Sequence, residues 1–286
     1  MVAFNFSRNP QRVKKINTKF RKIKTSIPRP GTKKILERLE KIESRSMQGQ
    51  LPIIWDKAID FSVYDKSGNC WIDFTSTIFV ANVGHSNKEL TKNIINQLNK
   101  NLISTYAYVN EVRSTYQNKL LKFAGKNFEK TYLVSTGSEA TEAALKLMRM
   151  NGQSIGKKRL GIVSLENNWH GRTMGSQMMS GNLKQKEWVG YEDKDIHHLK
   201  FPYPWILKEE TGEEFFNKNI KDLIQKGINP KTDICGMIFE TFQGWGAIFY
   251  PKDFIKAAEK FCKDNDIVLT FSLVWLFVCF IKSQVK

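Results

Sequence analysis

A turn of small and polar residues opens a helix near the middle of the chain. Segment 131–150 begins with a β-branched and aromatic run that predicts a strand, breaks at Thr136 and then becomes helical. Thr136 and Glu139 fit a capping box, in which a hydroxyl and a carboxylate each hold a backbone amide. First-turn amides lack carbonyl partners, and the helix dipole adds about half a positive charge there. Gly137 and Ser138 are therefore candidates for binding an anion such as phosphate; the alternative is a capped helix with hydrated amides.

Two more polar loops follow predicted strands. ENNWHGRT, residues 166–173, comes after an apolar run at 160–165, and QGWG, residues 243–246, comes after another at 234–240. Apolar strands that alternate with helices predict a mostly parallel sheet covered on both faces. Ligands of such sheets gather at the carboxyl ends of the strands. We therefore expect the three loops to converge on one site.

The remaining periodic segments predict the elements around these loops. Apolar spacing predicts helices at about 88–100, 113–123 and 253–262. The helix that follows Ser138 carries an apolar stripe. We expect this helix to end just before Gly152, because glycine is common directly after a helix C-terminus. Short strands in hairpins are expected between residues 53 and 76.

Charge and composition restrict the classes of function. Net charge is +17, and residues 1–45 carry fourteen Lys or Arg against three Glu. Such a basic arm could contact nucleic acid or an anionic membrane, but no nucleic-acid motif accompanies it, so we favour a solvated surface. The four cysteines lack metal-ligand spacing, and His197 and His198 lack acidic or thiol neighbours at ligand spacing, so we interpret them as loop residues. The absence of an apolar signal segment favours the cytoplasm.

Taken together, the loops resemble the class III, fold-type I aminotransferases that use pyridoxal 5′-phosphate, a group that includes ornithine, acetylornithine and 4-aminobutyrate aminotransferases. STGSEATEAALKLMR is similar to the family's phosphate-binding turn, ENNWHGRT to its ring-stacking loop and FETFQGWGA to its strand-end Glu-x-x-Gln-Gly segment. DKSGNCWIDFTSTIFVANVGHSN is similar to a strand and loop of the small domain. The likeness covers residues 47–271 and involves four motifs in order.

The resemblance implies roles for six residues of the chain. Gly137 and Ser138 would bind the cofactor phosphate, Trp169 would lie flat against the pyridine ring, and His170 would support that loop. The alternative for Trp169 is an ordinary core tryptophan. The resemblance also implies that two more cofactor-binding residues, Glu240 and Gln243, would lie near the polar edge of the ring.

The chain departs from the family pattern after residue 271. The family continues with Asp-Glu-x-Gln, whose Asp pairs with the pyridine nitrogen, whereas Ser272 and Leu273 stand here. The Schiff-base lysine belongs to a later region of the family, so we expect a truncated, inactive chain and an unpaired sheet edge. Segment 272–286 is interpreted as a frameshifted or prematurely ended continuation; the less favoured alternative is a membrane tail over 267–281.

The sequence thus predicts an α/β protein: an incomplete fold-type I large domain, with a mostly parallel sheet and helices on both faces, after a small α+β segment. We divide it into a basic N-terminal segment (1–46), a small-domain part (47–105), a pyridoxal-phosphate-binding large domain (106–271) and an unmatched apolar tail (272–286). The implied reaction moves an amino group from an amino donor to a 2-oxo acid. The resemblance also implies a homodimer, and we expect no nucleic-acid or membrane partner. The alternatives are a catalytically dead binding or dimerising module and a basic-arm nucleic-acid binder.

Overall fold

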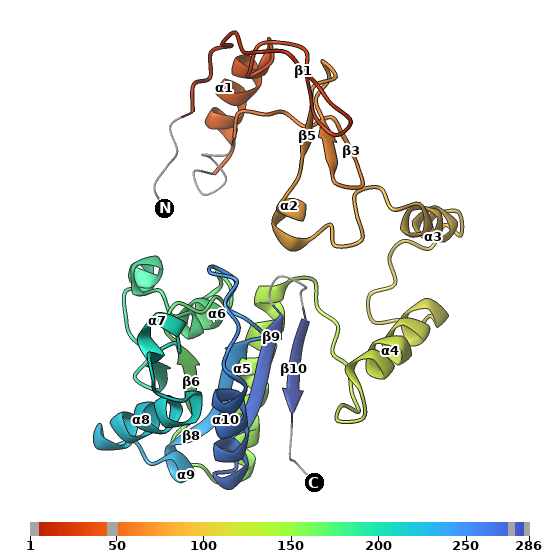
Figure 1. The fold of residues 1–286 in the computed structure, drawn as a ribbon. Coiled ribbons are helices and arrows are strands. Elements are labelled where there is room, and N and C mark those ends of the chain that lie inside the picture. The colour runs from red at the N-terminus through yellow and green to blue at the C-terminus, as the bar shows by residue number, and fades with distance from the viewer. Residues whose placement is uncertain (1–5, 45–50, 274–277, 283–286) are drawn as a thin grey trace. The chain divides into compact units, whose positions relative to one another are not determined.

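The computed structural model describes residues 6–44, 51–273 and 278–282. The chain divides into two compact units, Met1–Ala107 and Tyr108–Lys286 (Figure 1). The division between the units falls two residues beyond the boundary expected at 105. The finer division into four segments stays a prediction.

Unit 1 is built on a five-stranded antiparallel sheet in the order β1-β2-β5-β4-β3. Its strands are β1 (Ile16–Asn17), β2 (Lys22–Ile23), β3 (Lys57–Ile59), β4 (Ser62–Tyr64) and β5 (Cys70–Ile72). Its helices are α1 (Thr32–Ile42), α2 (Ser76–Phe79) and α3 (Lys88–Leu98). The predicted hairpins between residues 53 and 76 and the predicted helix near 88–100 are therefore confirmed.

The basic N-terminal segment belongs to this sheet. β2 pairs with β5 through Lys22 and Cys70. The fully buried Asn69 accepts hydrogen bonds from the backbone amides of Lys24 (2.6 Å) and Thr25 (3.2 Å). Its own amide nitrogen donates to Asp65 Oδ2 at 2.8 Å. One side chain thus fastens the basic segment to the turn between β4 and β5.

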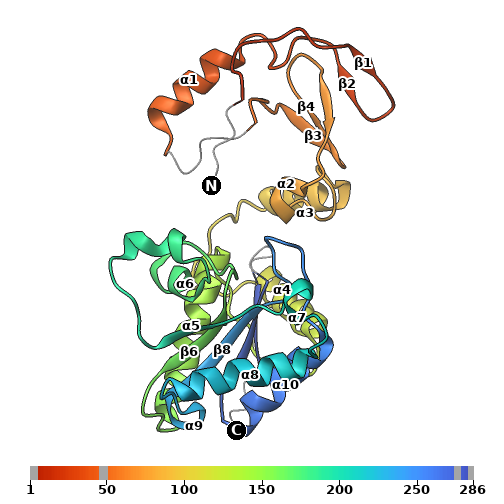
Figure 2. The same cartoon turned by 60° about the vertical axis from the view of Figure 1, so that its left-hand side comes forward.

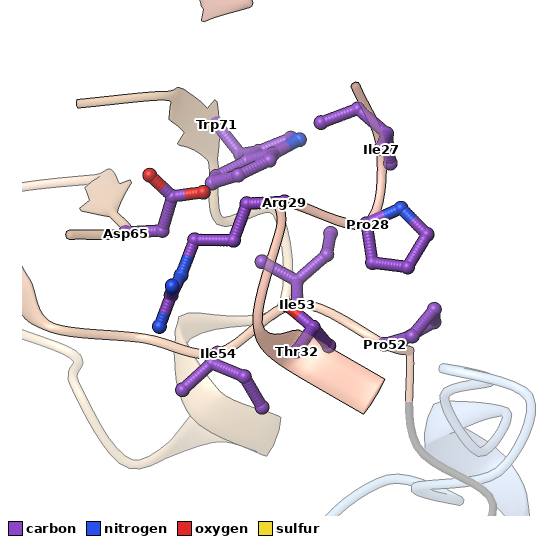
Figure 3. Close-up of a pocket in the computed structure, with 9 residues that line it drawn as sticks. All are labelled: Ile27, Pro28, Arg29, Thr32, Pro52, Ile53, Ile54, Asp65 and Trp71. Carbon is purple, nitrogen blue, oxygen red and sulfur yellow. The ribbon is translucent and has the colours of Figure 1, made fainter. Parts of the chain in front are cut away.

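A small hollow without room for a water molecule lies next to this junction (Figure 3). Arg29, Asp65 and the indole of Trp71 line it together with apolar residues. Thr32 is fully buried beneath them, and its hydroxyl has no hydrogen-bond partner in the described part of the chain. The hollow is the packing seam between the N-terminal segment and the hairpins.

Unit 2 contains a second five-stranded sheet, in the order β10-β9-β8-β6-β7. β6, β7, β8 and β9 are parallel, and β10 is antiparallel to β9. The strands are β6 (Gly161–Leu165), β7 (Ile196–Leu199), β8 (Ile234–Glu240), β9 (Val268–Leu273) and β10 (Val278–Lys282). The helices are α4 (Glu111–Ala124), α5 (Gly137–Ser154), α6 (Met174–Met179), the 3-10 helix η2 (Leu183–Val189), α7 (Pro204–Leu207), α8 (Gly212–Gln225), α9 (Pro230–Asp233) and α10 (Lys252–Asp264).

Helices cover both faces of this sheet (Figure 2). Successive residues of β8 alternate between two hydrophobic clusters: Met237 and Phe239 pack with α8 and α10, whereas Ile238 packs with α5 and α6. All residues of β6 and β8 are buried, which explains their continuous apolar sequences. The predicted α/β class is confirmed, as are the helices predicted at 113–123 and 253–262.

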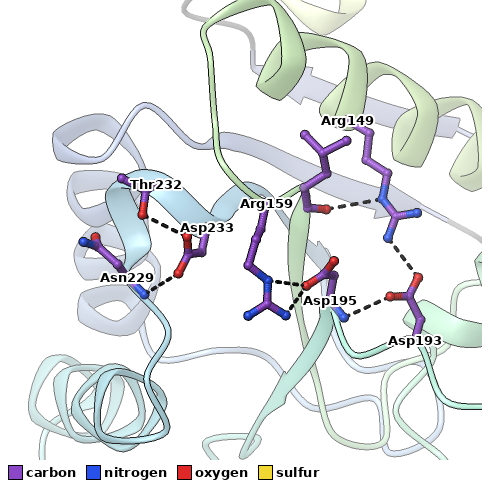
Figure 4. Close-up of polar contacts among 8 residues, drawn as sticks. Arg149, Arg159, Asp193, Asp195, Asn229, Thr232 and Asp233 are labelled. Carbon is purple, nitrogen blue, oxygen red and sulfur yellow. Dashed lines mark hydrogen bonds and ion pairs between the residues drawn. The ribbon is translucent and has the colours of Figure 1, made fainter.

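Arginines tie the amino ends of two strands together (Figure 4). Arg159, just before β6, pairs with Asp195, just before β7. Arg149 on α5 donates to Asp193 at 2.9 Å and to the Leu160 carbonyl at 3.3 Å. These contacts lie at the end of the sheet opposite to the three polar loops.

Two local predictions about α5 were wrong. Gly152 lies inside the helix, two residues before its last residue, and not beyond its end. A methyl group there would collide with Cys235 on β8, so glycine serves close packing of helix and strand. Residues 131–134 form no strand, and Tyr132 is 75% exposed, because no neighbouring strand pairs with this segment in the described ranges.

Two other predictions also failed. His197 and His198 lie within β7 and not in a loop, because their flanking residues Ile196 and Leu199 are buried in the sheet. The edge of β9 is not unpaired, since β10 pairs with it from Val278↔Leu273 to Lys282↔Leu269. The described residues of the alternative membrane tail are thus strands, and no described helix has the length and apolar character needed to cross a membrane.

Candidate functional site

The start of α5 carries the predicted capping box. Thr136 Oγ1 accepts a hydrogen bond from the Glu139 amide at 3.1 Å, and Glu139 Oε2 accepts from the amides of Ser135 (2.6 Å) and Thr136 (3.2 Å). The next two amides, of Gly137 and Ser138, have no acceptor among the residues that the structure describes. They combine free donors with the positive end of an 18-residue helix.

The loop at 166–173 packs directly against this helix start. Thr141 Oγ1, fully buried on α5, donates to the His170 carbonyl at 2.7 Å. The Arg172 amide donates to Ser138 Oγ at 3.3 Å. Gly171 adopts φ +139°, and a side chain there would strike the Ser138 hydroxyl. The first two polar loops are thus joined, as their positions in the sequence predict.

Glu142 holds the far end of the same loop. Its Oε1 accepts hydrogen bonds from the Thr173 hydroxyl (2.5 Å) and from the amides of Gly175 (2.8 Å) and Ser176 (3.1 Å). Together with Ser138 and Thr141, Glu142 makes three residues of α5 that bond to the loop. The loop is therefore preorganised by α5.

His170 lies beneath the loop and is fully buried. Its Nε2 is 3.1 Å from Ser164 Oγ on β6, and its amide donates to Ser180 Oγ at 2.9 Å. Burial and, to a lesser extent, the electrostatic effect of nearby His198 lower the pKa of His170 to about 3. A histidine that is neutral at physiological pH and inaccessible can support the loop but cannot exchange protons with a ligand.

The side chain of Trp169 is half-buried in the middle of the loop. Its amide donates to Glu240 Oε2 at 3.1 Å, and its ring meets Trp245 edge-on, with centroids 5.8 Å apart. The guanidinium carbon of Arg172 lies 5.4 Å from the centroid of the Trp169 ring, within the range of a cation–π contact. The indole is therefore partly buried, with aromatic and cationic neighbours.

Glu240 joins the second loop to the third. It is the last residue of β8 and only 2% exposed, and its Oε1 accepts from the Gly244 amide at 3.2 Å while Oε2 accepts from Trp169. Gln243, equally buried, directs its side-chain amide to the Tyr203 hydroxyl at 2.6 Å. Glu240 thus lies at the convergence of the loops, whereas the Gln243 side chain is committed to Tyr203.

Ser272 lies beside Glu240 at the end of the neighbouring strand. The two residues are register partners in the parallel pair β8–β9. Ser272 is 1% exposed, and within the described ranges its hydroxyl has no hydrogen-bond partner. The carboxyl edge of the sheet therefore presents a carboxylate and an unengaged hydroxyl side by side.

Sequence reasoning missed two residues of this arrangement. Thr141 lies four residues after Gly137, on the same helical face, and that spacing was the available signal. Arg172 follows Trp169 by three residues, and a cation close to an aromatic residue can bind the face of its ring. The described residues contain no cluster of His, Cys, Asp or Glu that could hold a metal ion.

Comparison with known proteins identifies the family. The family described as Aminotransferase class-III matches residues 44–273. Mitochondrial acetylornithine aminotransferase of Candida glabrata is 31% identical over 222 residues, which are 75% of this chain and 48% of that protein. Acetylornithine aminotransferase of Wolinella succinogenes is 32% identical over 212 residues, 73% of this chain and 48% of that protein. The chain thus spans about half the length of these curated relatives.

Solved structures agree on the fold. Taurine:2-oxoglutarate aminotransferase from Bifidobacterium kashiwanohense, in complex with PLP and glutamate, has a TM-score of 0.72 at 19% identity, covering 83% of this chain and 54% of that one. An aminotransferase of Bacillus anthracis has a TM-score of 0.73 at 22% identity, covering 83% and 54%. The architecture of unit 2 is that of the fold-type I transferase large domain. The chain belongs to the class III aminotransferase family.

Proposed function

We propose that this chain binds pyridoxal 5′-phosphate at the convergence of its three loops and forms the cofactor-holding part of an aminotransferase site. The amides of Gly137 and Ser138 would hold the phosphate, and the Trp169 indole would cover the pyridine ring. The single observation that carries the proposal is the unengaged pair of amides at the start of α5, to which the Trp169 loop is bonded through Thr141.

The residues present fit the phosphate end of this cofactor. Two free backbone donors at a helix N-terminus match a phosphate dianion in both charge and geometry. Gly171 keeps the space beside Ser138 free of a side chain. When bound, the cofactor supplies the electron sink for chemistry at the carbon that carries the amino group.

The three loops supply no lysine for the transfer reaction. Transfer of an amino group from an amino donor to a 2-oxo acid needs a lysine at the cofactor, and the three loops contain none. Lys186, near the second loop, donates its ammonium hydrogens to the carbonyls of Met178 (3.0 Å) and Ser180 (2.9 Å). We infer that the three loops hold the cofactor and contribute no lysine to the transfer.

Cofactor binding is tested by titrating pyridoxal phosphate into the full chain and following quenching of tryptophan fluorescence. A stacked aromatic contributes about 1 kcal/mol, so Trp169→Ala should raise the Kd about fivefold. Trp188→Ala, a change on η2 at a residue that is 59% exposed, is the matched control and should leave the Kd unchanged. Equal Kd values in all three proteins, or no binding by the wild-type chain, would refute the proposed site.

We further propose that the chain forms a homodimer. The residues around α4 support it, because none of the helix is buried and large apolar side chains stand exposed on and near it: Tyr108 (81%), Val109 (87%), Val112 (49%), Tyr116 (53%) and Phe123 (82%). Such a patch is unusual on a monomer surface. Sedimentation equilibrium should give twice the 33.1 kDa chain mass, and Phe123→Glu should shift the mass towards the monomer. A wild-type chain that remains monomeric would contradict the proposal.

We also propose that the chain is cytoplasmic and does not bind nucleic acid. Cys70, Cys235 and Cys262 are buried and unpaired, as expected in a reducing compartment. The basic segment is engaged in the sheet of unit 1 through Asn69 and is not a separate arm. Cell fractionation tests the location, and retention on DNA at physiological salt would contradict the second assignment.

A further inference from the structure

The Ser272 hydroxyl is a buried polar group without a partner. Its side chain is 1% exposed, and nothing in the part of the chain that the structure describes donates to it or accepts from it. Buried hydroxyls are nearly always hydrogen-bonded, because removing one from water without compensation is costly. An exception at the carboxyl end of a parallel strand calls for a partner that binds there.

The direction of the Ser272 side chain follows from its neighbours along β9. Phe271 packs against Phe239, on the face covered by α8 and α10. Thr270 contacts Met148 Sδ of α5 at 3.5 Å, on the opposite face. Because side chains alternate along a strand, Ser272 shares the face of Thr270. It therefore lies on the α5 side of the sheet, at the edge where α5 begins.

Ser272 and the free amides thus lie on the same face of the sheet, towards its carboxyl edge. The helix start offers Gly137 and Ser138 as anion donors, and Glu240, the register partner of Ser272, is bonded to the Trp169 loop. Both Glu240 oxygens already accept backbone amides, from Trp169 and Gly244. The hydroxyl of Ser272 therefore has unused hydrogen-bonding capacity on the sheet itself, as Asn168 Oδ1 and His170 Nδ1 have in the Trp169 loop.

We propose that Ser272 donates its hydroxyl hydrogen to the ring nitrogen of pyridoxal phosphate, which is bound in its unprotonated form. This inference rests on the proposed function. A hydroxyl is neutral, so it satisfies a nitrogen lone pair without the negative charge that would stabilise a pyridinium. The site accordingly holds the cofactor with a neutral ring, which is a weaker electron sink than a protonated one.

The first test uses two probes on the full wild-type chain. Pyridoxal phosphate has a ring nitrogen that can accept a hydrogen bond, whereas its N-methyl derivative carries a methyl group and a positive charge there. We expect the wild type to bind pyridoxal phosphate about tenfold more tightly than the N-methyl compound. Ser272→Ala should weaken pyridoxal phosphate about fivefold and reduce this preference, while Ser154→Ala, at the exposed end of α5, should change neither affinity.

The second test reads the protonation state directly. The ¹⁵N NMR shift of ring-labelled cofactor should report an unprotonated nitrogen in the wild type and a protonated one in Ser272→Asp. If the wild type binds the cofactor but shows a protonated nitrogen, or if Ser272→Ala binds both probes like the wild type, the inference is overturned and the proposed function stands. If no protein quenches on titration with pyridoxal phosphate, the proposed function itself fails.

Discussion

Replacing Thr141 by valine removes one hydroxyl from the contact between α5 and the Trp169 loop. The side chain is fully buried, and Oγ1 donates to the His170 carbonyl at 2.7 Å and contacts the Ser138 carbonyl at 3.0 Å. Valine has nearly the same shape, so packing is retained and the hydrogen bond alone is lost. The His170 carbonyl is then left buried without this donor.

The size of the effect follows from that unsatisfied carbonyl. Leaving a buried acceptor without its partner costs about 1–3 kcal/mol, so we expect the free energy of unfolding of unit 2 to fall by about 2 kcal/mol. Thr270 provides a matched control, because it is also fully buried on the α5 face, and among the described residues its hydroxyl bonds to Met148 Sδ alone, a weak acceptor. Thr270→Val should change the free energy by less than about 0.5 kcal/mol.

Urea unfolding followed by tryptophan fluorescence measures both variants, and unchanged m-values would show that the unfolding reaction is the same. Thr141→Val should also weaken pyridoxal phosphate binding, since the loop that carries Trp169 loses one of its links to the helix start. The reasoning fails if Thr270→Val costs as much as Thr141→Val, because the hydrogen bond to the loop would then be irrelevant.

Three further outcomes follow from buried contacts. Gly152→Ala should lower the free energy of unfolding by about 1–2 kcal/mol. The reason is that the collision with Cys235 outweighs a gain of about 1 kcal/mol in helix propensity. Urea unfolding measures this change, and a stabilised variant would contradict the prediction. Asn69→Ala should leave the Lys24 amide unsatisfied and speed tryptic cleavage of the basic segment, measured by mass spectrometry, whereas an unchanged rate would contradict the anchoring role. Because the pKa of His170 is lowered to about 3, its contribution to stability is complete above about pH 6.5 and is lost as the pH falls towards 3, since only the unfolded chain takes up the proton. Wild-type stability should therefore decline between about pH 6.5 and pH 5 more steeply than that of His170→Asn, by about 1 kcal/mol per pH unit, and parallel profiles would refute this.

Local chemistry in the sequence was sufficient for much of unit 2. The capping box at Thr136, the alternation of apolar strands with helices and the polar loops at strand ends are each specified by a few neighbouring residues. The contact of the second loop with Ser138 was expected, but its premise was wrong in part, because no strand precedes Ser138; the rule on carboxyl ends applies only to the loops after β6 and β8. These features depend on periodicity and capping, which a sequence displays directly.

The features that were missed depend on neighbours far away in the sequence. Gly152 is read locally as a helix terminator, and only the closeness of Cys235 on β8 explains a glycine inside the helix. His197 and His198 look polar, yet the sheet includes them because Ile196 and Leu199 are buried. The side chain of Gln243 turns to Tyr203, forty residues earlier, a pairing that no motif encodes.

The pairing of β10 with β9 shows that the backbone pairing at a sheet edge tolerates a change of sequence better than a ligand-binding side chain does. The family match ends at residue 273, yet the strand at Val278–Lys282 completes the ladder beyond it. Main-chain hydrogen bonds do not distinguish one side chain from another, so an unrelated peptide can shield the border of a sheet. If Ser272 binds the ring nitrogen as proposed, the side chain of one residue at the end of β9 sets the protonation of the cofactor, whereas the pairing of β10 with β9 does not depend on that side chain.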